Sequence, residues 1–286
     1  MKKPLCVFTV GSDTTNEQYA QKMLNSLYKT NPDIESQADV KFFKAGEMIQ
    51  AGFTLLPNDL KMRYPTPILM KLLLQEYECV VRLDADMIIT GDISSCWEGD
   101  FDVAVVQNGN PRELAAQQAM MGRTVQVWDL NPLDYVNCGF VVVKNEAFVD
   151  NWLRLCTPDR ANAYQFYEQD FLNILVHYGN WKVKFLDRGD SFWGLASKGY
   201  WPQIIFDTKD GFGTPPNVNS RESKTLILPK NSGDDREPWP TDCDKIIKCL
   251  HWAGGGGAPK FHDIDIRFDA EVAKYLKDLI TDEKKD

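Results

Sequence analysis

Two carboxylates stand two positions apart directly after an apolar run. The segment Cys79–Leu83 is expected to form a buried strand. Asp84, Ala85 and Asp86 follow it. In extended chain, residues i and i+2 point to the same side, so both carboxylates can face one cation. Carboxylate oxygens suit Mg²⁺ or Mn²⁺, whose shells are often completed by substrate phosphates. The pair therefore predicts either a divalent-cation site or a solvated acidic turn.

A histidine and a glycine run follow a second apolar segment, Ile246–Leu250, which is expected to form the last strand. Adding the imidazole of His251 to two carboxylates gives an N/O ligand set that favours Mn²⁺ over Mg²⁺. The glycines 254–257 would let backbone N–H groups approach a diphosphate closely, and Lys260 could neutralise part of its charge. A flexible linker with a partly buried histidine is the alternative.

A third motif places an amide and a glycine before an apolar run. Asn137 and Gly139 precede Phe140–Val143. The amide could bind a sugar hydroxyl, and the glycine could leave room for the sugar ring. Taken alone, the motif favours a tight turn into a strand.

A fourth motif consists of three adjacent polar residues, Glu168, Gln169 and Asp170, within the helical segment expected over residues 163–178 and just ahead of its apolar residues. They could present a carboxylate or an amide to an active site. Taken alone, they are better interpreted as the solvated face of a helix.

The elements that must position these residues alternate between strands and helices, which indicates an α/β fold with a mostly parallel sheet in the N-terminal half. The segment 207–244 is rich in Gly, Pro, Asp and Ser and predicts long loops. The expected strands cover residues 5–10, 40–43, 79–83, 103–106, 140–143, 183–186 and 246–250, and the expected helices cover 14–27, 68–77, 146–155, 163–178 and 272–279.

Composition narrows the class of protein. The 286 residues are 43% hydrophobic and 26% charged, as in a folded globular protein, and their net charge of −9 argues against a nucleic-acid partner. Seven cysteines without a Cys-x-x-Cys pair suggest free thiols in a reducing compartment. The first apolar run, Leu5–Val10, is too short for a signal peptide or a membrane helix. We therefore expect a cytoplasmic protein without an integral membrane segment.

The four motifs, in this order, resemble those of the family 8 glycosyltransferases, which are retaining, glycogenin-like and bacterial galactosyltransferase-like enzymes with a GT-A fold. The resemblance covers roughly residues 5–261. It implies one GT-A catalytic domain over residues 1–286, with a nucleotide-binding half at 5–106. A sugar and acceptor half would span 107–262, with its long loops at 207–244, and a C-terminal helix would span 263–286.

The resemblance also implies roles for individual residues. Asp84, Asp86 and His251 would hold Mn²⁺ (or Mg²⁺), and Glu168, Gln169 and Asp170 would be the catalytic group. Glu168 stands where the family usually has Asp. The residues implied in donor binding are Thr9, Gly11, Tyr19, Lys71, Asp84, Ala85, Asp86, Asn137, Gly139, Gly254 and Lys260.

The implied reaction is transfer of a hexose or pentose from a nucleotide sugar, expected to be a UDP-sugar, to a hydroxyl of a glycan, a glycoprotein or another acceptor. Retention of configuration is expected, either with Gln169 or Asp170 assisting on one face of the sugar or with the acceptor attacking on the face of the leaving group. An inverting relative would instead need a carboxylate base beside the acceptor hydroxyl, such as Asp170 or Asp190. A sugar nucleotidyltransferase is a rival, although Gly11-Ser12-Asp13-Thr14 is a poor version of its Gly-rich loop. The other rival is a catalytically silent protein that binds carbohydrate or nucleotide.

Overall fold

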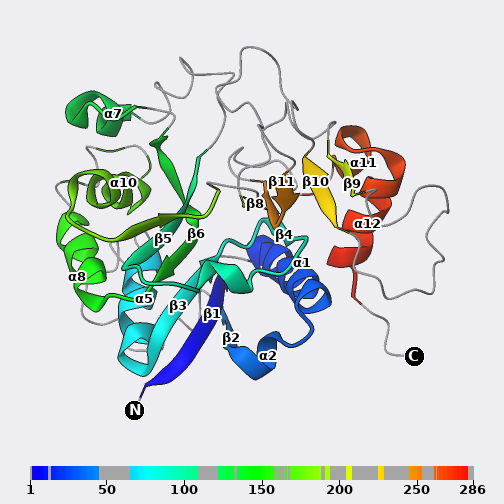
Figure 1. The fold of residues 1–286 in the computed structure, drawn as a ribbon, viewed down its shortest axis with the longest axis horizontal. Helices are drawn as coiled ribbons and strands as arrows, with labels where there is room; N and C mark the ends of the chain where they lie inside the picture. Colours follow the sequence, from blue (N-terminus) through cyan, green and yellow to red (C-terminus); the bar gives the residue numbers. More distant parts are fainter. Residues whose placement is uncertain are drawn as a thin grey trace.

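The structure, a computed structural model, is an α/β fold in which helices cover both faces of a central sheet (Figure 1). It describes residues 2–11, 14–44, 65–108, 122–131, 134–157, 160, 164, 166, 168–187, 191–193, 204–207, 225–228, 245–252, 261 and 263–282.

The central sheet has six strands in the order β2-β1-β3-β6-β5-β7. Strand β1 runs parallel to β2 and β3, and β5 runs parallel to β7, whereas β6 is antiparallel to both of its neighbours. The expected mostly parallel sheet is therefore confirmed. The strands are β1 (Lys3–Gly11), β2 (Asp39–Lys44), β3 (Tyr77–Leu83), β5 (Val103–Gln107), β6 (Val136–Val143) and β7 (Val183–Phe185).

Both faces of this sheet are buried because its strands are apolar almost without interruption. Phe8 and Val80 face a cluster that includes residues of α5 (Pro65–Glu76), α8 (Glu146–Leu155) and α10 (Glu168–Tyr178). The alternate strand residues, such as Val7 and Val81, pack with residues of α1 (Thr14–Thr30) on the opposite face. The remaining helical segments are α2 (Ile34–Gln37), the short η2 (Ser94–Cys96), α7 (Gly122–Trp128), α11 (Ile264–Arg267) and α12 (Ala270–Ile280).

Two smaller sheets lie beside the central one. A four-stranded sheet has the order β8-β11-β10-β9, and β4 pairs with β12 in a separate ribbon. The single last strand expected over Ile246–Leu250 is wrong, because the chain leaves one sheet at Ile247 and enters the other at Cys249. The strands are β4 (Met87–Ile89), β8 (Ser191–Phe192), β9 (Ile205–Phe206), β10 (Leu226–Leu228), β11 (Lys245–Ile247) and β12 (Cys249–His251).

The C-terminal helix, α12, packs against the first helix, α1. As expected, α12 has an apolar stripe, and Leu276 is fully buried. Asn25 and Lys29 of α1 donate hydrogen bonds to the backbone carbonyls of Ile280 and Thr281, respectively. The acceptor carbonyls at the end of α12 are thus satisfied by side chains of α1.

The structure corrects three expectations at the interface between β6 and α10. Asn137, Cys138 and Gly139 do not form a turn before a strand; they lie within β6, where the pairing with β5 shifts register after Val105. The helix expected from residue 163 begins at Glu168. Its polar first turn is not a solvated face, because Gln169 and Asp170 are buried.

Amide side chains of α10 hold the irregular part of β6. The Asn173 carboxamide accepts from Val136 N at 2.7 Å and donates to Val136 O at 2.9 Å. It also donates to the carbonyl of Gln169 at 2.8 Å, and the Gln169 side chain accepts from Cys138 N at 3.1 Å. These bonds satisfy strand backbone groups where the register shift interrupts the β5–β6 ladder.

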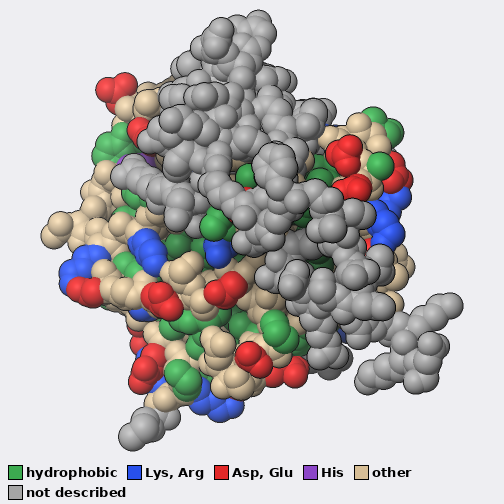
Figure 2. All heavy atoms as spheres, turned by 45° about the vertical axis from the view of Figure 1, so that its right-hand side comes forward, with side chains coloured by type: hydrophobic (Ala, Val, Ile, Leu, Met, Phe, Trp, Pro, Cys, Tyr) green, Lys and Arg blue, Asp and Glu red, His purple; other side chains and the backbone are tan. Residues whose placement is uncertain are grey.

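Several features expected from the composition can be checked against the structure. The six cysteines among the described residues are free thiols; Cys243 lies outside them. Acidic and basic side chains are interspersed over the described part of the face in Figure 2. Within the described chain, no helix has both the length and the apolar character needed to cross a membrane.

Replacing Asn173 by alanine should lower the free energy of unfolding by about 2–4 kcal/mol, because backbone groups of β6 then stay buried without their partner. Asn151→Ala is the matched control, since its amide bonds the Ala147 carbonyl at an exposed position of α8. This control should change stability by less than about 0.5 kcal/mol. Urea denaturation of both variants measures the difference, and equal effects would contradict the supporting role of Asn173.

Candidate metal centre

The Asp-Ala-Asp segment lies where the central sheet passes into the β4–β12 ribbon. The backbone N–H of Asp84 donates to Gly139 O at 2.8 Å, which extends the β3–β6 pairing by one residue. The carbonyl of Asp86 accepts from Trp252 N at 2.9 Å, which extends the ribbon. Ala85 is buried between them. Backbone pairing on both sides therefore fixes the positions of the backbone atoms that carry the two carboxylate side chains.

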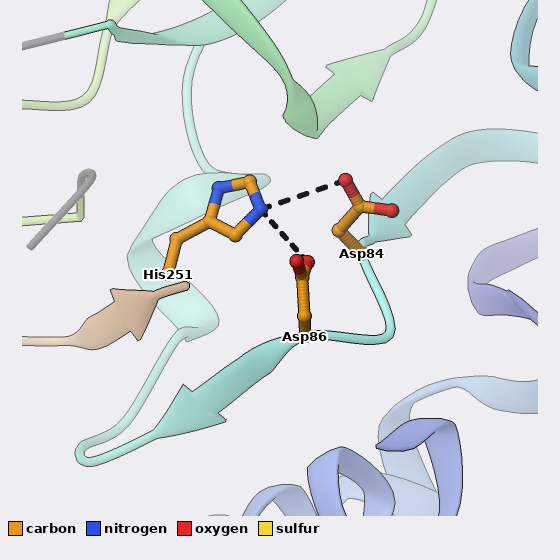
Figure 3. Close-up of side chains that lie close together, drawn as sticks. All are labelled: Asp84, Asp86 and His251. Atoms are coloured by element: carbon orange, nitrogen blue, oxygen red, sulfur yellow. Dashed lines mark hydrogen bonds and ion pairs between the residues drawn. The ribbon is translucent and has the colours of Figure 1, made fainter. Parts of the chain in front are cut away.

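His251 of β12 joins the two carboxylates. Its Nε2 lies 3.0 Å from Asp86 Oδ1 and 3.5 Å from Asp84 Oδ2 (Figure 3). The ligand atoms of the three residues all lie within 4.8 Å of one another, and the histidine side chain is only 3% exposed. The structure thus brings together the three residues that the sequence singled out as metal ligands.

The electrostatics of this cluster fit a cation. Burial disfavours the imidazolium, but the negative charges of Asp86 and Asp84 outweigh that effect and raise the pKa of His251 to about 9. The two carboxylates therefore create a negative potential at the imidazole that favours positive charge. A divalent ion would satisfy the same potential while bound to the neutral imidazole. One nitrogen and two carboxylate oxygens form a donor set that fits Mn²⁺.

Gly139 is the position where β6 approaches this cluster. A Cβ atom there would lie 2.5 Å from His251 Cε1, 2.7 Å from Asn137 Oδ1 and 3.0 Å from Asp84 Oδ2. The Asn137 side chain accepts from Gly139 N at 2.6 Å and donates to Asn108 Oδ1 at 3.1 Å. The glycine is therefore required for packing against the ligands, and Asn137 forms part of the adjacent wall.

Arg82 is a residue of the site that the motifs did not include. Its Nη2 donates to Asp84 Oδ1 at 3.0 Å, and its Nη1 donates to the carbonyl of Cys138. The sequence did offer one signal for Arg82. It is a charged residue in the otherwise apolar run before Asp84, and it lies on the same side of the strand as Asp84. The sequence contains no local indication of its second partner.

The three polar residues of α10 differ in their surroundings. Removal from solvent raises the pKa of the Glu168 carboxyl to about 7, although the charge of Arg82 opposes this rise. Gln169 bonds the backbone beside Gly139, as described above. The Asp170 carboxylate accepts from Tyr135 Oη at 2.6 Å and from Phe166 N at 2.7 Å. Gln169 thus bonds the strand residue next to Gly139, and the Glu168 carboxyl is influenced by the charges of Arg82 and Asp84. Asp170 instead holds the backbone of Phe166, before the helix.

The residues expected near the nucleotide lie around the end of β1. Phe8 pairs with Arg82, so Thr9 lies beside the last residue of β3. Thr9 is buried, and its hydroxyl has no hydrogen-bond partner among the described residues. At Gly11 a Cβ would lie 2.7 Å from Glu17 Cγ, so the lack of a side chain at this glycine allows α1 to pack close to the end of β1.

Two further candidates make contacts that can be described, and two lie outside the described residues. The Tyr19 ring packs edge-on against Phe261, with centroids 5.8 Å apart. The ammonium of Lys71 pairs with the carboxylate of Asp150 in α8. This contact is with a neighbouring helix and not with a metal ligand. Gly254 and Lys260 lie outside the described residues.

The fold resembles that of solved glycosyltransferases. The apo structure of the bifunctional glycosyltransferase WbbM superposes with a TM-score of 0.55 at 15% identity, over 99% of this chain and 50% of that one. The galactosyltransferase LgtC, in complex with donor and acceptor sugar analogues, superposes with a TM-score of 0.54 at 13% identity over 98% of both chains. An active-site variant of LgtC gives a TM-score of 0.53 at 12% identity.

This chain therefore has the GT-A fold, as the motifs implied. It spans half the length of the WbbM chain and nearly all of the LgtC chain. The sequence matches no protein-family profile and no curated protein.

Gly139→Ala should weaken Mn²⁺ binding by at least about tenfold, because the added methyl group displaces His251 and Asp84. Gly91→Ala is the matched control: it follows β4, and its Cβ would lie 3.4 Å from Ile247 O, an ordinary contact. Isothermal titration of both variants with Mn²⁺ measures the effect. Wild-type affinity in Gly139→Ala would show that the packing at this glycine does not shape the metal centre.

Proposed function

We propose that this protein is a metal-dependent glycosyltransferase that moves a hexose or pentose from a UDP-sugar to a hydroxyl of a glycan, a glycoprotein or another acceptor. The observation that carries the proposal is the convergence of Asp84, Asp86 and His251 at the end of β3. The GT-A fold supports it, because the solved structures that share the fold are glycosyltransferases.

In the proposed mechanism, the three ligands hold Mn²⁺, which when bound stabilises the charge that develops on the departing nucleoside diphosphate. Asp84 and Asp86 are themselves anionic, so they would act on that leaving group only as ligands of the cation at the end of β3. Thr9, with its buried hydroxyl, and Gly11 and Tyr19 would border the nucleoside. Gly254 and Lys260 would contact the diphosphate from the segment after β12.

The sugar is proposed to lie between the metal centre and the first turn of α10. Asn137 and Gly139 would form one wall, and Glu168 and Gln169 would form another. We propose retention of configuration, with Gln169 assisting on the face of the sugar opposite the leaving group. Asp170 has a supporting role in this arrangement, because its carboxylate holds Tyr135 and the backbone before the helix.

The nucleotide-binding and acceptor halves proposed at 5–106 and 107–262 meet within β5, so both contribute strands to one sheet. A site built from both halves would allow the donor to bind at β1 and β3 while the acceptor enters from the later loops. The acceptor half includes the loops 207–244.

The rival functions differ in their response to UDP and metal. A panel of nucleotide sugars should show Mn²⁺-dependent hydrolysis with at least one UDP-sugar, because donors are slowly cleaved by water in place of an acceptor. A nucleotidyltransferase would instead form a nucleotide sugar from a sugar phosphate and a nucleoside triphosphate. A silent sugar-binding protein would bind UDP no better when Mn²⁺ is added, which calorimetry measures.

Asp86→Ala and His251→Ala should each lower the Mn²⁺-dependent hydrolysis of the donor by about 100-fold, because each removes one ligand of the same cation. His177→Ala is the matched control, since this histidine packs against Phe185 rather than at the metal centre. Initial rates over a series of Mn²⁺ concentrations would measure the effect. Unchanged metal-dependent turnover in the first two variants would refute the proposed site.

A further inference from the structure

Arg82 is a buried cation next to the proposed metal ligands. It lies in β3 two residues before Asp84, so both side chains leave the strand on the same side. Its side chain is only 10% exposed, and its guanidinium reaches two acceptors. These are Asp84 Oδ1 and the carbonyl of Cys138, so one planar group joins the end of β3 to the irregular part of β6.

The two oxygens of the Asp84 carboxylate therefore have different neighbours. Oδ1 accepts from Arg82 at 3.0 Å, whereas Oδ2 faces His251 Nε2 at 3.5 Å. A guanidinium bond to a carboxylate is charge-assisted and directional, so it fixes the rotation of the group it holds. The oxygen turned towards the other ligands is Oδ2.

We infer that Arg82 is a positioning residue that presents Asp84 to the cation through one oxygen and thereby favours Mn²⁺ over Ca²⁺. The inference rests on the proposed metal site. Ca²⁺ accepts six to eight oxygen ligands, including bidentate carboxylates, whereas smaller divalent ions require a tighter octahedral shell. Holding Oδ1 away from the cation removes the bidentate arrangement that the larger ion uses.

Charge alone does not produce this selectivity. The positive charge of Arg82 repels any divalent cation, and it acts equally on Mn²⁺ and Ca²⁺ because both carry two charges. Its removal would change both affinities in the same direction. The ratio of the two dissociation constants cancels that common effect and isolates the control of the Asp84 carboxylate.

The test is calorimetric titration of the full chain with Mn²⁺ and, separately, with Ca²⁺. In Arg82→Gln, the preference for Mn²⁺ over Ca²⁺ should fall by about tenfold, the size expected when a partner of a metal ligand is lost. Arg82→Lys keeps the charge but loses the fork, so it should shift the ratio in the same direction by a smaller factor. If Arg82→Gln does not fold, as judged by circular dichroism, Arg82→Lys provides the result.

Arg267→Gln is the matched control, because this arginine pairs with the carboxylate of Asp263 in the C-terminal region. It should leave the ratio unchanged. A wild-type ratio in a folded Arg82 variant, with Mn²⁺ still bound, would overturn the role of Arg82 alone. Absence of Mn²⁺ binding to the wild-type chain would overturn the proposed metal site and this inference together.

Discussion

The structure depends on keeping two carboxylates beside each other at a partly buried position. The ligand oxygens of Asp84 and Asp86 lie within 4.8 Å of each other. Two negative charges at about that separation repel by on the order of 3 kcal/mol at an effective dielectric constant of about 20. His251 lies on one side of the pair, and the guanidinium of Arg82 lies on the other. The fold therefore places Asp84 and Asp86 between a histidine and an arginine, at a position where a cation would offset their repulsion.

The compensation depends on a long-range return of the chain. His251 is 165 positions from Asp86, and it arrives only because β12 pairs with β4. The ribbon continues directly from the Asp-Ala-Asp segment, so the same backbone pairing that extends the sheet also delivers the imidazole. Gly139 closes the cluster from β6, and it leaves no room for even one additional carbon.

The metal ligands were predictable because their chemistry and their place after apolar strands are local features. Asp84 and Asp86 follow a strand, and His251 follows the apolar run Ile246–Leu250 and ends β12, so sequence patterns locate all three. The role of Arg82 was not predictable in the same way, because its partner on β6 is set by tertiary pairing. The split between β11 and β12 was missed for a similar reason: a short apolar run does not reveal that its two halves join different sheets.

The interface between β6 and α10 shows why a polar helix turn is ambiguous in sequence. Asn173 and Asp170 are buried, yet their side chains are used by backbone groups and a tyrosine rather than by a ligand site. The side-chain oxygen of Gln169 likewise accepts from a backbone group, Cys138 N next to Gly139, and in the proposed site the same side chain would also face the sugar. Stability and site geometry are therefore coupled through one helix turn. A substitution at Gln169 would alter the backbone that carries Gly139 as well as the wall proposed to face the sugar, so loss of activity alone would not identify it as the catalytic group.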